Sequence, residues 1–281
     1  MREISTEKIV ESVSALCLKA AFELPQDMRD ALAKSAKTEP SPLGQSMLNQ
    51  LVENYSIAEK KRMPICQDTG VAVFFVEIGQ DLRITGGTIY EALKDAVAKG
   101  WKEGYLRMSI VEDPLFTRKN TGINGPPIIH VSQVTGDKLK IYLAPKGGGS
   151  ENMSRLVMLK PTVGAPVVAD FVVETVTLAG GNPCPPIVVG VGIGGNFETA
   201  PILAKKALLR HLGDPNPDPK YAEFEKMLLD RINATGLGPQ GLGGRTTAMA
   251  VHVEHLPCHM ASLPVAVNLN CHAARHASLE L

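Results

Sequence analysis

The hydrophobic pattern of this chain changes near residue 63, and the change limits the folds open to it. Before that point, apolar residues such as Ile9, Val13 and Leu16 recur at helical spacing. After it come short apolar runs typical of buried strands. Because strands and helices do not alternate regularly, we predict an α+β protein in which a helical N-terminal segment precedes a mixed β-sheet packed with helices. Strands are expected at 71–79, 127–134, 138–144, 186–191, 248–254 and 263–270.

Capping residues predict where several helices begin. Thr6 is expected to cap the first helix, and Pro25 and Pro42 are expected in the first turns of the next two. Thr88 and Glu91 form a capping box ahead of another helix. Further helices are expected within 164–179, 196–212 and 219–236.

The charge balance of the 281 residues argues against several kinds of partner. Lys plus Arg and Asp plus Glu both number 29, so the chain lacks the basic excess that nucleic-acid binding normally leaves. The charged N-terminus does not resemble a signal peptide, and no apolar run appears to approach the roughly 20 residues of a membrane span. We therefore expect a cytoplasmic protein with no nucleic-acid or membrane partner. We expect one domain, 1–281, with a helical part at 1–62 and an α/β part at 63–281.

Five cysteines, an odd number, argue against a disulfide framework in such a protein. Cys17 lies on the apolar stripe of the first helix, where core packing is expected. Cys66, in "MPICQDTG", instead lies in a loop before a buried strand, next to an amide, a carboxylate and a hydroxyl. Cys184 and Cys271 also lie in turns beside strands. Three loop thiols could hold an iron–sulfur cluster, although spacing alone fits three unrelated thiols better.

The segment "GVGIGG" at 190–195 has the spacing of a dinucleotide-binding loop. It follows an expected strand and is expected to open a helix. The second strand with an acidic end that such a site needs does not follow. We therefore favour an anion-binding or packing turn over a nicotinamide site.

The C-terminal region is rich in residues that bind zinc. A zinc site would make the chain a non-catalytic scaffold, which is the remoter alternative. The other interpretation is an alternating strand at 248–256 whose histidines face solvent. The possible ligands are His252, His255, Cys258, His259, Cys271, His272 and His276.

A set of motifs spread over nearly the whole chain resembles the iron–sulfur, or class I, fumarate hydratases. The same family includes L(+)-tartrate dehydratase. No single motif is specific, but the set and its order are. The motifs are "ICQDTG" at 65–70, "LRMSIVEDP" at 106–114, "RKNTGINGPP" at 118–127, "KGGGSEN" at 146–152, "NPCPP" at 182–186, "GPQGLGG" at 238–244 and "NCHAARHA" at 270–277.

The resemblance implies a [4Fe–4S] cluster held by Cys66, Cys184 and Cys271, with the fourth iron open to act as a Lewis acid. The implied reaction is the reversible hydration of fumarate to (S)-malate. The alternative within the family is dehydration of L(+)-tartrate to oxaloacetate.

The resemblance also implies a substrate site for a small dicarboxylate. Gln67 and Asp68 would lie at the substrate, Arg107 would bind a carboxylate through two hydrogen bonds, and backbone N–H groups around Gly148 would bind the other. The alternative roles are structural: Asp68 could brace its turn, and Arg107 could pair with Glu112. Further candidates are Arg118, Asn120 and Lys146.

The length of the chain matches the alpha subunit of a family member split into two chains. We expect a separate beta subunit, because the sequence ends soon after Cys271. By resemblance, that subunit supplies a threonine that acts as the base, and Asp68 helps to activate it, since a hydroxyl alone is a poor base. The chain alone is then expected to be inactive, with alpha chains pairing in a heterotetramer.

Overall fold

The computed structural model describes residues 2–281, which form two compact units. Unit 1 comprises the segment up to residue 25, residues 54–148 and residues 275–281. Unit 2 comprises residues 26–53 and 149–274. Each unit has its own sheet and its own apolar core, and each is described by itself below.

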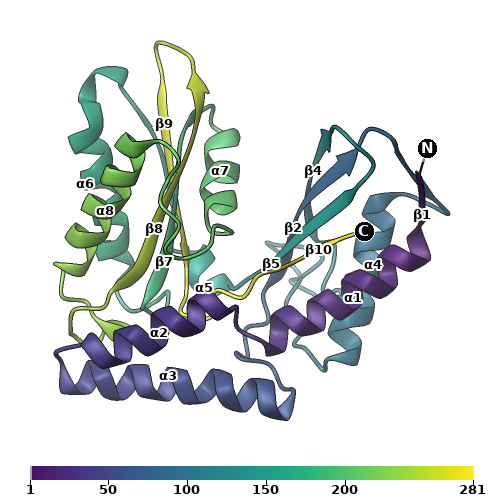
Figure 1. Ribbon diagram of the computed structural model, residues 1–281, viewed down its shortest axis with the longest axis horizontal. Helices are drawn as coiled ribbons and strands as arrows, with labels where there is room; N and C mark the ends of the chain where they lie inside the picture. Colours follow the sequence, from purple (N-terminus) through teal and green to yellow (C-terminus); the bar gives the residue numbers. More distant parts are fainter. Residues whose placement is uncertain (1) are drawn as a thin grey trace. The chain divides into compact units, whose positions relative to one another are not determined.

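Unit 1 is built on a four-stranded mixed sheet with the order β10-β5-β2-β4 (Figure 1). Strand β2 pairs parallel with β4 and antiparallel with β5. A separate short pair joins β1 and β3 in parallel. The elements of unit 1 are β1 (Arg2–Ser5), α1 (Thr6–Phe22), β2 (Val71–Gly79), β3 (Leu82–Thr85), α4 (Ile89–Glu103), β4 (Ile128–Val134), β5 (Leu139–Lys146) and β10 (Ala277–Glu280).

The core of unit 1 forms where α1 and α4 pack closely together. A Cβ added at Gly100 of α4 would lie 2.8 Å from the Cβ of Cys17 in α1, so only glycine allows this approach. Cys17 is fully buried, and burial raises the pKa of its thiol to about 12. The predicted core role of Cys17 is confirmed.

Unit 2 is built on a second four-stranded mixed sheet with the order β6-β9-β7-β8. Helices α6 and α8 cover one face of this sheet and α7 covers the other (Figure 1). Helix α3 begins in unit 2 and ends in unit 1, and the 148/149 boundary falls within α5. The remaining elements are α2 (Gln26–Thr38), α3 (Pro42–Lys61), α5 (Gly148–Glu151), β6 (Arg155–Leu159), α6 (Gly164–Ala179), β7 (Ile187–Gly195), α7 (Thr199–Ala207), α8 (Pro219–Asn233), β8 (Ala248–Cys258) and β9 (Leu263–Asn270), with 3₁₀ turns at Pro161–Val163 and Pro239–Gly241.

Strand β7 shows why its glycines are needed. Val189 and Val191 face the core that includes α6 and α8. The alternate residues Gly190 and Gly192 face α7, and a Cβ added at either would lie 2.0 or 2.1 Å from a carbonyl oxygen of that helix. "GVGIGG" therefore lies within a strand and allows a helix to pack on it. The packing interpretation is confirmed, and the expectation that this segment opens a helix is wrong.

The predicted α+β class is confirmed, and most expected strands are present. Strands β2 and β9 have the predicted bounds. The capping box of Thr88 and Glu91 is also present. Ser5 rather than Thr6 caps α1, since its side chain accepts from the N–H of Lys8.

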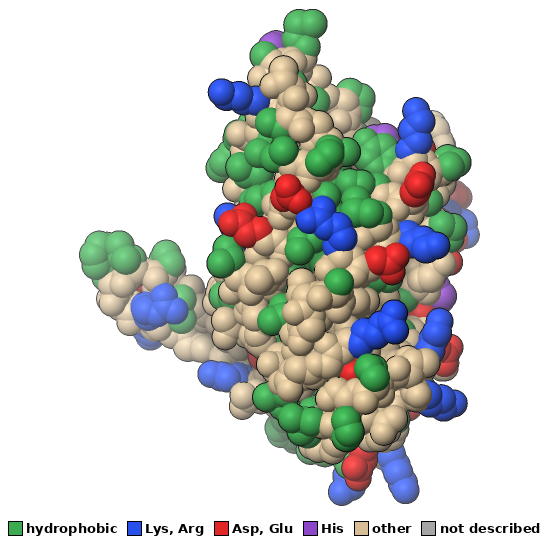
Figure 2. All heavy atoms as spheres, turned by 90° about the vertical axis from the view of Figure 1, so that its left-hand side faces the viewer, with side chains coloured by type: hydrophobic (Ala, Val, Ile, Leu, Met, Phe, Trp, Pro, Cys, Tyr) green, Lys and Arg blue, Asp and Glu red, His purple; other side chains and the backbone are tan. Residues whose placement is uncertain are grey.

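One helical stretch, Pro161–Ala179, is long and apolar enough to cross a membrane by length and composition, a run that the sequence analysis did not anticipate. Val168, Val172 and Val176 of this stretch are buried in the core of unit 2. Core helices pass the same test, so this packing accounts for its sequence. The face drawn in Figure 2 mixes basic, acidic and hydrophobic side chains and shows no continuous basic stripe.

Candidate functional site

The loop 66–70 connects α3 to β2 and carries the first group of predicted site residues. Cys66 and Asp68 are half-buried and Gln67 is exposed. Thr69 and Gly70 are buried and lead into the strand. The loop therefore presents a thiol, an amide and a carboxylate, while its last two residues anchor it to the core of unit 1.

The carboxylate of Asp68 is fixed by two backbone N–H groups. Its Oδ1 accepts from the N–H of Gly70 at 3.1 Å, and its Oδ2 accepts from the N–H of Gly148 at 2.7 Å. The predicted residues Asp68 and Gly148 are thus brought together, as direct partners of each other. Gly70 has a φ of +80°, and an added Cβ would lie 2.8 Å from the backbone of Lys146, so this close approach requires glycine. Lys146, a further candidate, is itself buried at the end of β5.

Arg107 is held beside this loop through its backbone. The buried hydroxyl of Thr69 donates to the carbonyl of Arg107 at 2.7 Å and accepts from the indole N–H of Trp101 at 3.2 Å. The guanidinium of Arg107 is exposed and, within residues 2–281, takes part in no ion pair. The alternative pairing with Glu112 is therefore absent from the described chain, and the guanidinium is available to an anion.

Arg118 and Asn120 brace the segment that follows Arg107. Arg118 donates to the carbonyl of Pro114 at 2.6 Å. Asn120 donates to the carbonyl of Met108 at 2.8 Å and accepts from the N–H of Gly122. Both side chains thus have structural roles in the structure.

Arg275 is a residue of this region that the sequence analysis did not single out. It is 3% exposed, and one end of its guanidinium donates to the backbone carbonyl of Asp68. Its Nε and Nη1 are buried without a hydrogen-bond partner. A buried guanidinium is costly without an acceptor or an anion, so these two donors suit a negatively charged group. The signal was its place in "NCHAARHA", four residues after Cys271.

In unit 2 the loops of Cys184 and Cys271 lie side by side. The N–H of His272 donates to the carbonyl of Cys184 at 3.3 Å. Cys184 is exposed, with a φ of +54°, and Cys271 is half-buried just after β9. Two predicted ligands far apart in the sequence are therefore neighbours through their backbones.

The "GPQGLGG" segment supports the Cys184 loop. Both the backbone N–H and the side-chain amide of Gln240 donate to the carbonyl of Pro185, at 2.8 and 2.7 Å. Glu39 of unit 2 accepts from the N–H groups of Arg245 and Thr246 just beyond the segment. Burial by itself would raise the pKa of Glu39, but these hydrogen bonds together lower it. The segment is thus anchored on both sides.

The three predicted cluster ligands fit a soft metal cofactor by chemistry and accessibility. Cys66, Cys184 and Cys271 all lie outside the core, unlike Cys17. Cys66 belongs to unit 1 and the other two to unit 2. Across residues 2–281, no group of three His, Cys, Asp or Glu side chains is arranged to hold a metal ion. The fit therefore rests on the donor types and on the pairing of the two unit 2 loops.

The alternative zinc ligands, all in unit 2, have separate surroundings. His252 is 2% exposed, whereas His255 is exposed and stacks on Tyr221 with ring centroids 4.2 Å apart. The thiol of Cys258 donates to the carbonyl of Ser262. The expectation that the strand histidines face solvent is confirmed for His255 and wrong for His252.

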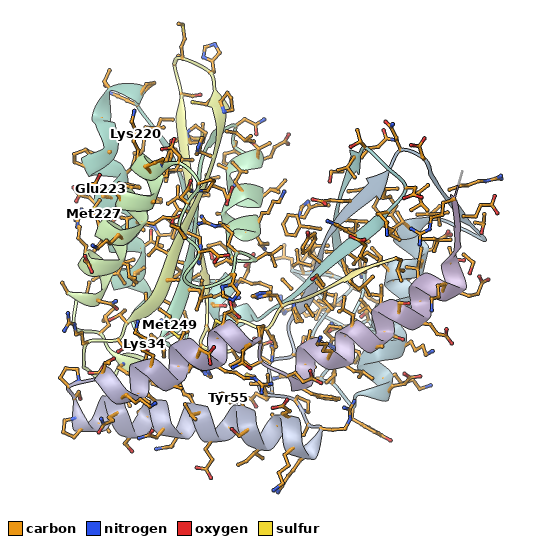
Figure 3. All side chains as sticks on the ribbon, in the orientation of Figure 1. Lys34, Tyr55, Lys220, Glu223, Met227 and Met249 are labelled. Carbon is orange, nitrogen blue, oxygen red and sulfur yellow. The ribbon has the colours of Figure 1, made fainter. Side chains whose placement is uncertain are left out.

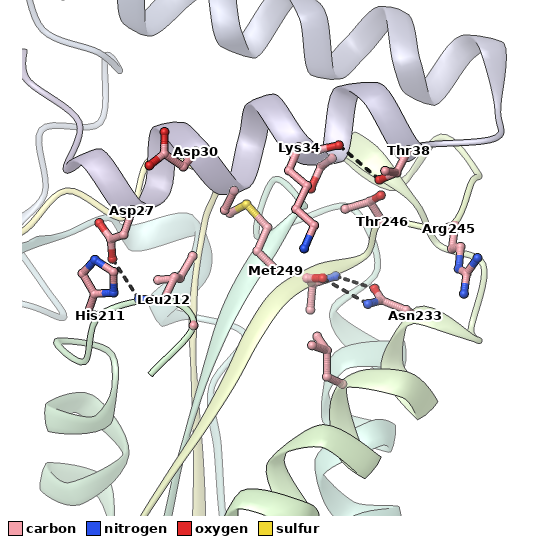
Figure 4. Close-up of a pocket in the computed structure, with 15 residues that line it drawn as sticks. Asp27, Asp30, Lys34, Thr38, His211, Leu212, Asn233, Arg245, Thr246 and Met249 are labelled. Atoms are coloured by element: carbon pink, nitrogen blue, oxygen red, sulfur yellow. Dashed lines mark hydrogen bonds between the residues drawn. The ribbon is translucent and has the colours of Figure 1, made fainter. Parts of the chain in front are cut away.

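A cavity of about 620 Å³ in unit 2 contains none of the predicted site residues. Lys34 of α2 and Met249 of β8 both line it (Figure 3). The polar groups at its wall serve the fold: Asp27 accepts from the N–H of Leu212, and Asn233 accepts from the first residues of β8 and the residue before it (Figure 4). These contacts assign the cavity wall a structural role.

Comparison with known proteins gives two kinds of match. Residues 10–280 match the family described as fumarate hydratase (Fumerase). A Methanocaldococcus jannaschii protein that carries the provisional name L(+)-tartrate dehydratase subunit alpha is 45% identical over 276 residues, 96% of either chain. Proteins named L(+)-tartrate dehydratase subunit alpha from Escherichia coli strains K12 and UTI89 are each 34% identical, over 99% and 100% of this chain and 92% and 93% of theirs.

Proposed function

The chain belongs to the fumarate hydratase (Fumerase) family, and on that premise we propose that it is the alpha subunit of a two-subunit [4Fe–4S] hydro-lyase. The proposed reaction is the reversible hydration of fumarate to (S)-malate. The proposal treats residues 1–281 as one functional domain of a cytoplasmic enzyme. The observation that carries it is the fixed carboxylate of Asp68, one residue from the exposed Gln67 and two from Cys66.

Cys66, Cys184 and Cys271 would hold the cluster. When bound, it supplies a Lewis acid that polarises the hydroxyl group leaving from, or entering, the substrate. Support comes from the donor types and from the hydrogen bond between the loops of Cys184 and Cys271. The buried, unpartnered donors of Arg275 would face a negatively charged group, which agrees with an anionic cofactor or substrate.

The residues of this chain would bind and orient a dicarboxylate. The exposed guanidinium of Arg107 suits one carboxylate as a two-pronged donor. Gln67 would donate its amide to the substrate, and the N–H groups beginning at Gly148 would bind the other carboxylate. Because the N–H of Gly148 already donates to Asp68, a substrate carboxylate there would share or replace that contact.

Asp68 would act on a proton through a second residue. Its two oxygens accept from backbone donors, which orient the carboxylate and favour its charged form. A charged carboxylate beside a hydroxyl can draw the proton of that hydroxyl and make it a better base. The hydroxyl would be a threonine of the beta subunit, called the companion subunit below. Two alpha chains and two companion subunits would form the heterotetramer.

A second substrate is favoured by a specific observation. The relatives at 45% and 34% identity carry the name of L(+)-tartrate dehydratase, so dehydration of L(+)-tartrate to oxaloacetate is the second candidate. The two substrates differ by one hydroxyl group. The test is the rate of the reconstituted pair on (S)-malate and on L(+)-tartrate. A higher kcat/KM on malate supports the first candidate, a higher value on tartrate supports the second, and no turnover of either contradicts the proposal.

A further inference from the structure

The segment after Arg107 in unit 1 forms a braced hairpin, residues 108–124, which we call the 108–124 hairpin. Its two arms are joined by hydrogen bonds from the N–H of Glu112 to the carbonyl of Lys119 and from the N–H of Thr121 to the carbonyl of Ile110. A β-bridge joins Val111 to Asn120 between them. The hairpin is therefore an ordered projection with its own internal bonds.

The base of the hairpin is fixed to the candidate site loop. The buried side chain of Asn124 donates to the carbonyl of Gly70 at 3.1 Å and accepts from the N–H of Ser109 at 2.7 Å. Thr69 fixes the carbonyl of Arg107 just before the first arm. The hairpin and the loop 66–70 thus form one connected surface of unit 1.

The tip of the hairpin exposes two large apolar side chains on a fixed turn. Asp113 accepts from the N–H groups of Thr117, Leu115 and Phe116, and these bonds lower the pKa of its carboxyl to about 2. Leu115 is 71% exposed and Phe116 is 85% exposed. A pre-organised turn that displays an aromatic side chain loses little entropy on binding, which is typical of an interface anchor.

We propose that the tip of the 108–124 hairpin is the docking point for the companion subunit, whose surface there is an apolar pocket with acidic residues at its rim. This inference rests on the proposed function, in which a second chain must reach Asp68 to complete the site. A surface bonded to the Asp68 loop is where such a chain has to bind. Lys119 and Arg118 follow the apolar pair, while Asp113 is used by the turn, so the tip suits an acidic partner.

The charge of the tip also argues against a second copy of this chain. In a twofold interface each residue at the axis meets its own counterpart or a neighbour of it. Two copies of the tip would bring Arg118 and Lys119 of both chains together, and like charges repel. A different chain with acidic residues avoids this repulsion.

The test is the affinity of the companion subunit for the full chain and for its Phe116→Asp variant. We expect the variant to bind about 30-fold more weakly or worse, because the substitution places a charge in an apolar pocket. The matched control is Phe197→Asp, since Phe197 is 68% exposed and lies in unit 2. The control is expected to change the affinity less than about twofold. Circular dichroism and thermal unfolding of each variant verify the fold.

A second variant tests the charge of the tip. Lys119→Glu is expected to slow association about tenfold at low salt, with a smaller difference at high salt. Wild-type affinity for Phe116→Asp, or an equal loss in Phe116→Asp and Phe197→Asp, overturns the inference. A change only in self-association of the alpha chain also overturns it, in favour of a second copy.

Failure of the proposed function gives a different result. If the wild-type chain does not bind the companion subunit, both the docking point and the two-subunit enzyme are wrong. If the pair forms and turns over substrate while Phe116→Asp binds normally, only the docking point is wrong.

Discussion

Two glycine-rich regions of this chain resemble each other in sequence and differ in what lies opposite them. In β7, Gly190 and Gly192 face carbonyl oxygens of α7, so their missing side chains let a helix pack on a strand. At residues 147–148, the glycines face the carboxylate of Asp68, and the N–H of Gly148 donates to it. The first region stabilises a core and the second positions a charged group. Glycine spacing alone therefore does not separate a packing site from a binding site.

The largest expected effect is in β7. Gly190→Ala places a Cβ 2.0 Å from the carbonyl oxygen of Ala204, and α7 has to move. We expect the free energy of unfolding to fall by about 3 kcal/mol or more in urea unfolding. Gly148→Ala is the matched control, because its Cβ would lie 3.8 Å from Asp68, and its stability should change by less than about 1 kcal/mol. Equal losses would contradict the difference between the regions.

Asp68→Asn tests the second region through activity. The amide keeps an acceptor for the N–H of Gly70 but removes the negative charge. We expect kcat of the enzyme reconstituted with the companion subunit to fall about 100-fold or more, while stability changes by less than about 2 kcal/mol. A variant that loses stability but keeps its kcat would reduce Asp68 to a brace of its turn.

His252 of β8 gives the core region a pH dependence. Burial lowers the pKa of His252 to about 4, helped by the charge of Arg210 and opposed by those of Glu225, Asp214 and Asp27. The unfolded chain then binds a proton at higher pH than the folded chain, so stability is full above about pH 6.5 and falls as the pH falls toward 4. We expect this residue to remove about 2 kcal/mol between pH 7 and pH 5. His252→Gln should flatten the profile by that amount; an unchanged profile would contradict the assignment.

Gly147→Ala is the smallest expected effect and the finest test of the comparison. Its Cβ would lie 3.0 Å from Oδ2 of Asp68, so the carboxylate has to shift by a few tenths of an ångström. We expect about a tenfold loss in kcat with little change in stability, because positioning is sensitive to small displacements. Unchanged kcat would mean that the orientation of Asp68 is not critical.

The sequence predicted elements whose ends and burial are set locally. Strands β2 and β9 are apolar runs bounded by turn residues, and their bounds were predicted correctly. The short strands β1, β3, β6 and β10 were missed, because pairing with distant segments rather than their own pattern makes them strands.

The same limit applies to the candidate site. The loop of Cys66 and Asp68 was visible because its polar residues interrupt an apolar context. Arg275 was not, because its burial and its bond to Asp68 depend on a contact across 207 positions. The packing role of Gly190 likewise depends on α7, which no local pattern reveals.

The most direct test of the central claim is the iron and sulfide content of the chain after anaerobic reconstitution. Wild type and Cys258→Ser should each hold close to the four irons and four sulfides of the proposed cluster, and Cys66→Ser should lose most of both. Zinc instead of iron, unaffected by Cys66→Ser and lost in Cys258→Ser, would contradict the account.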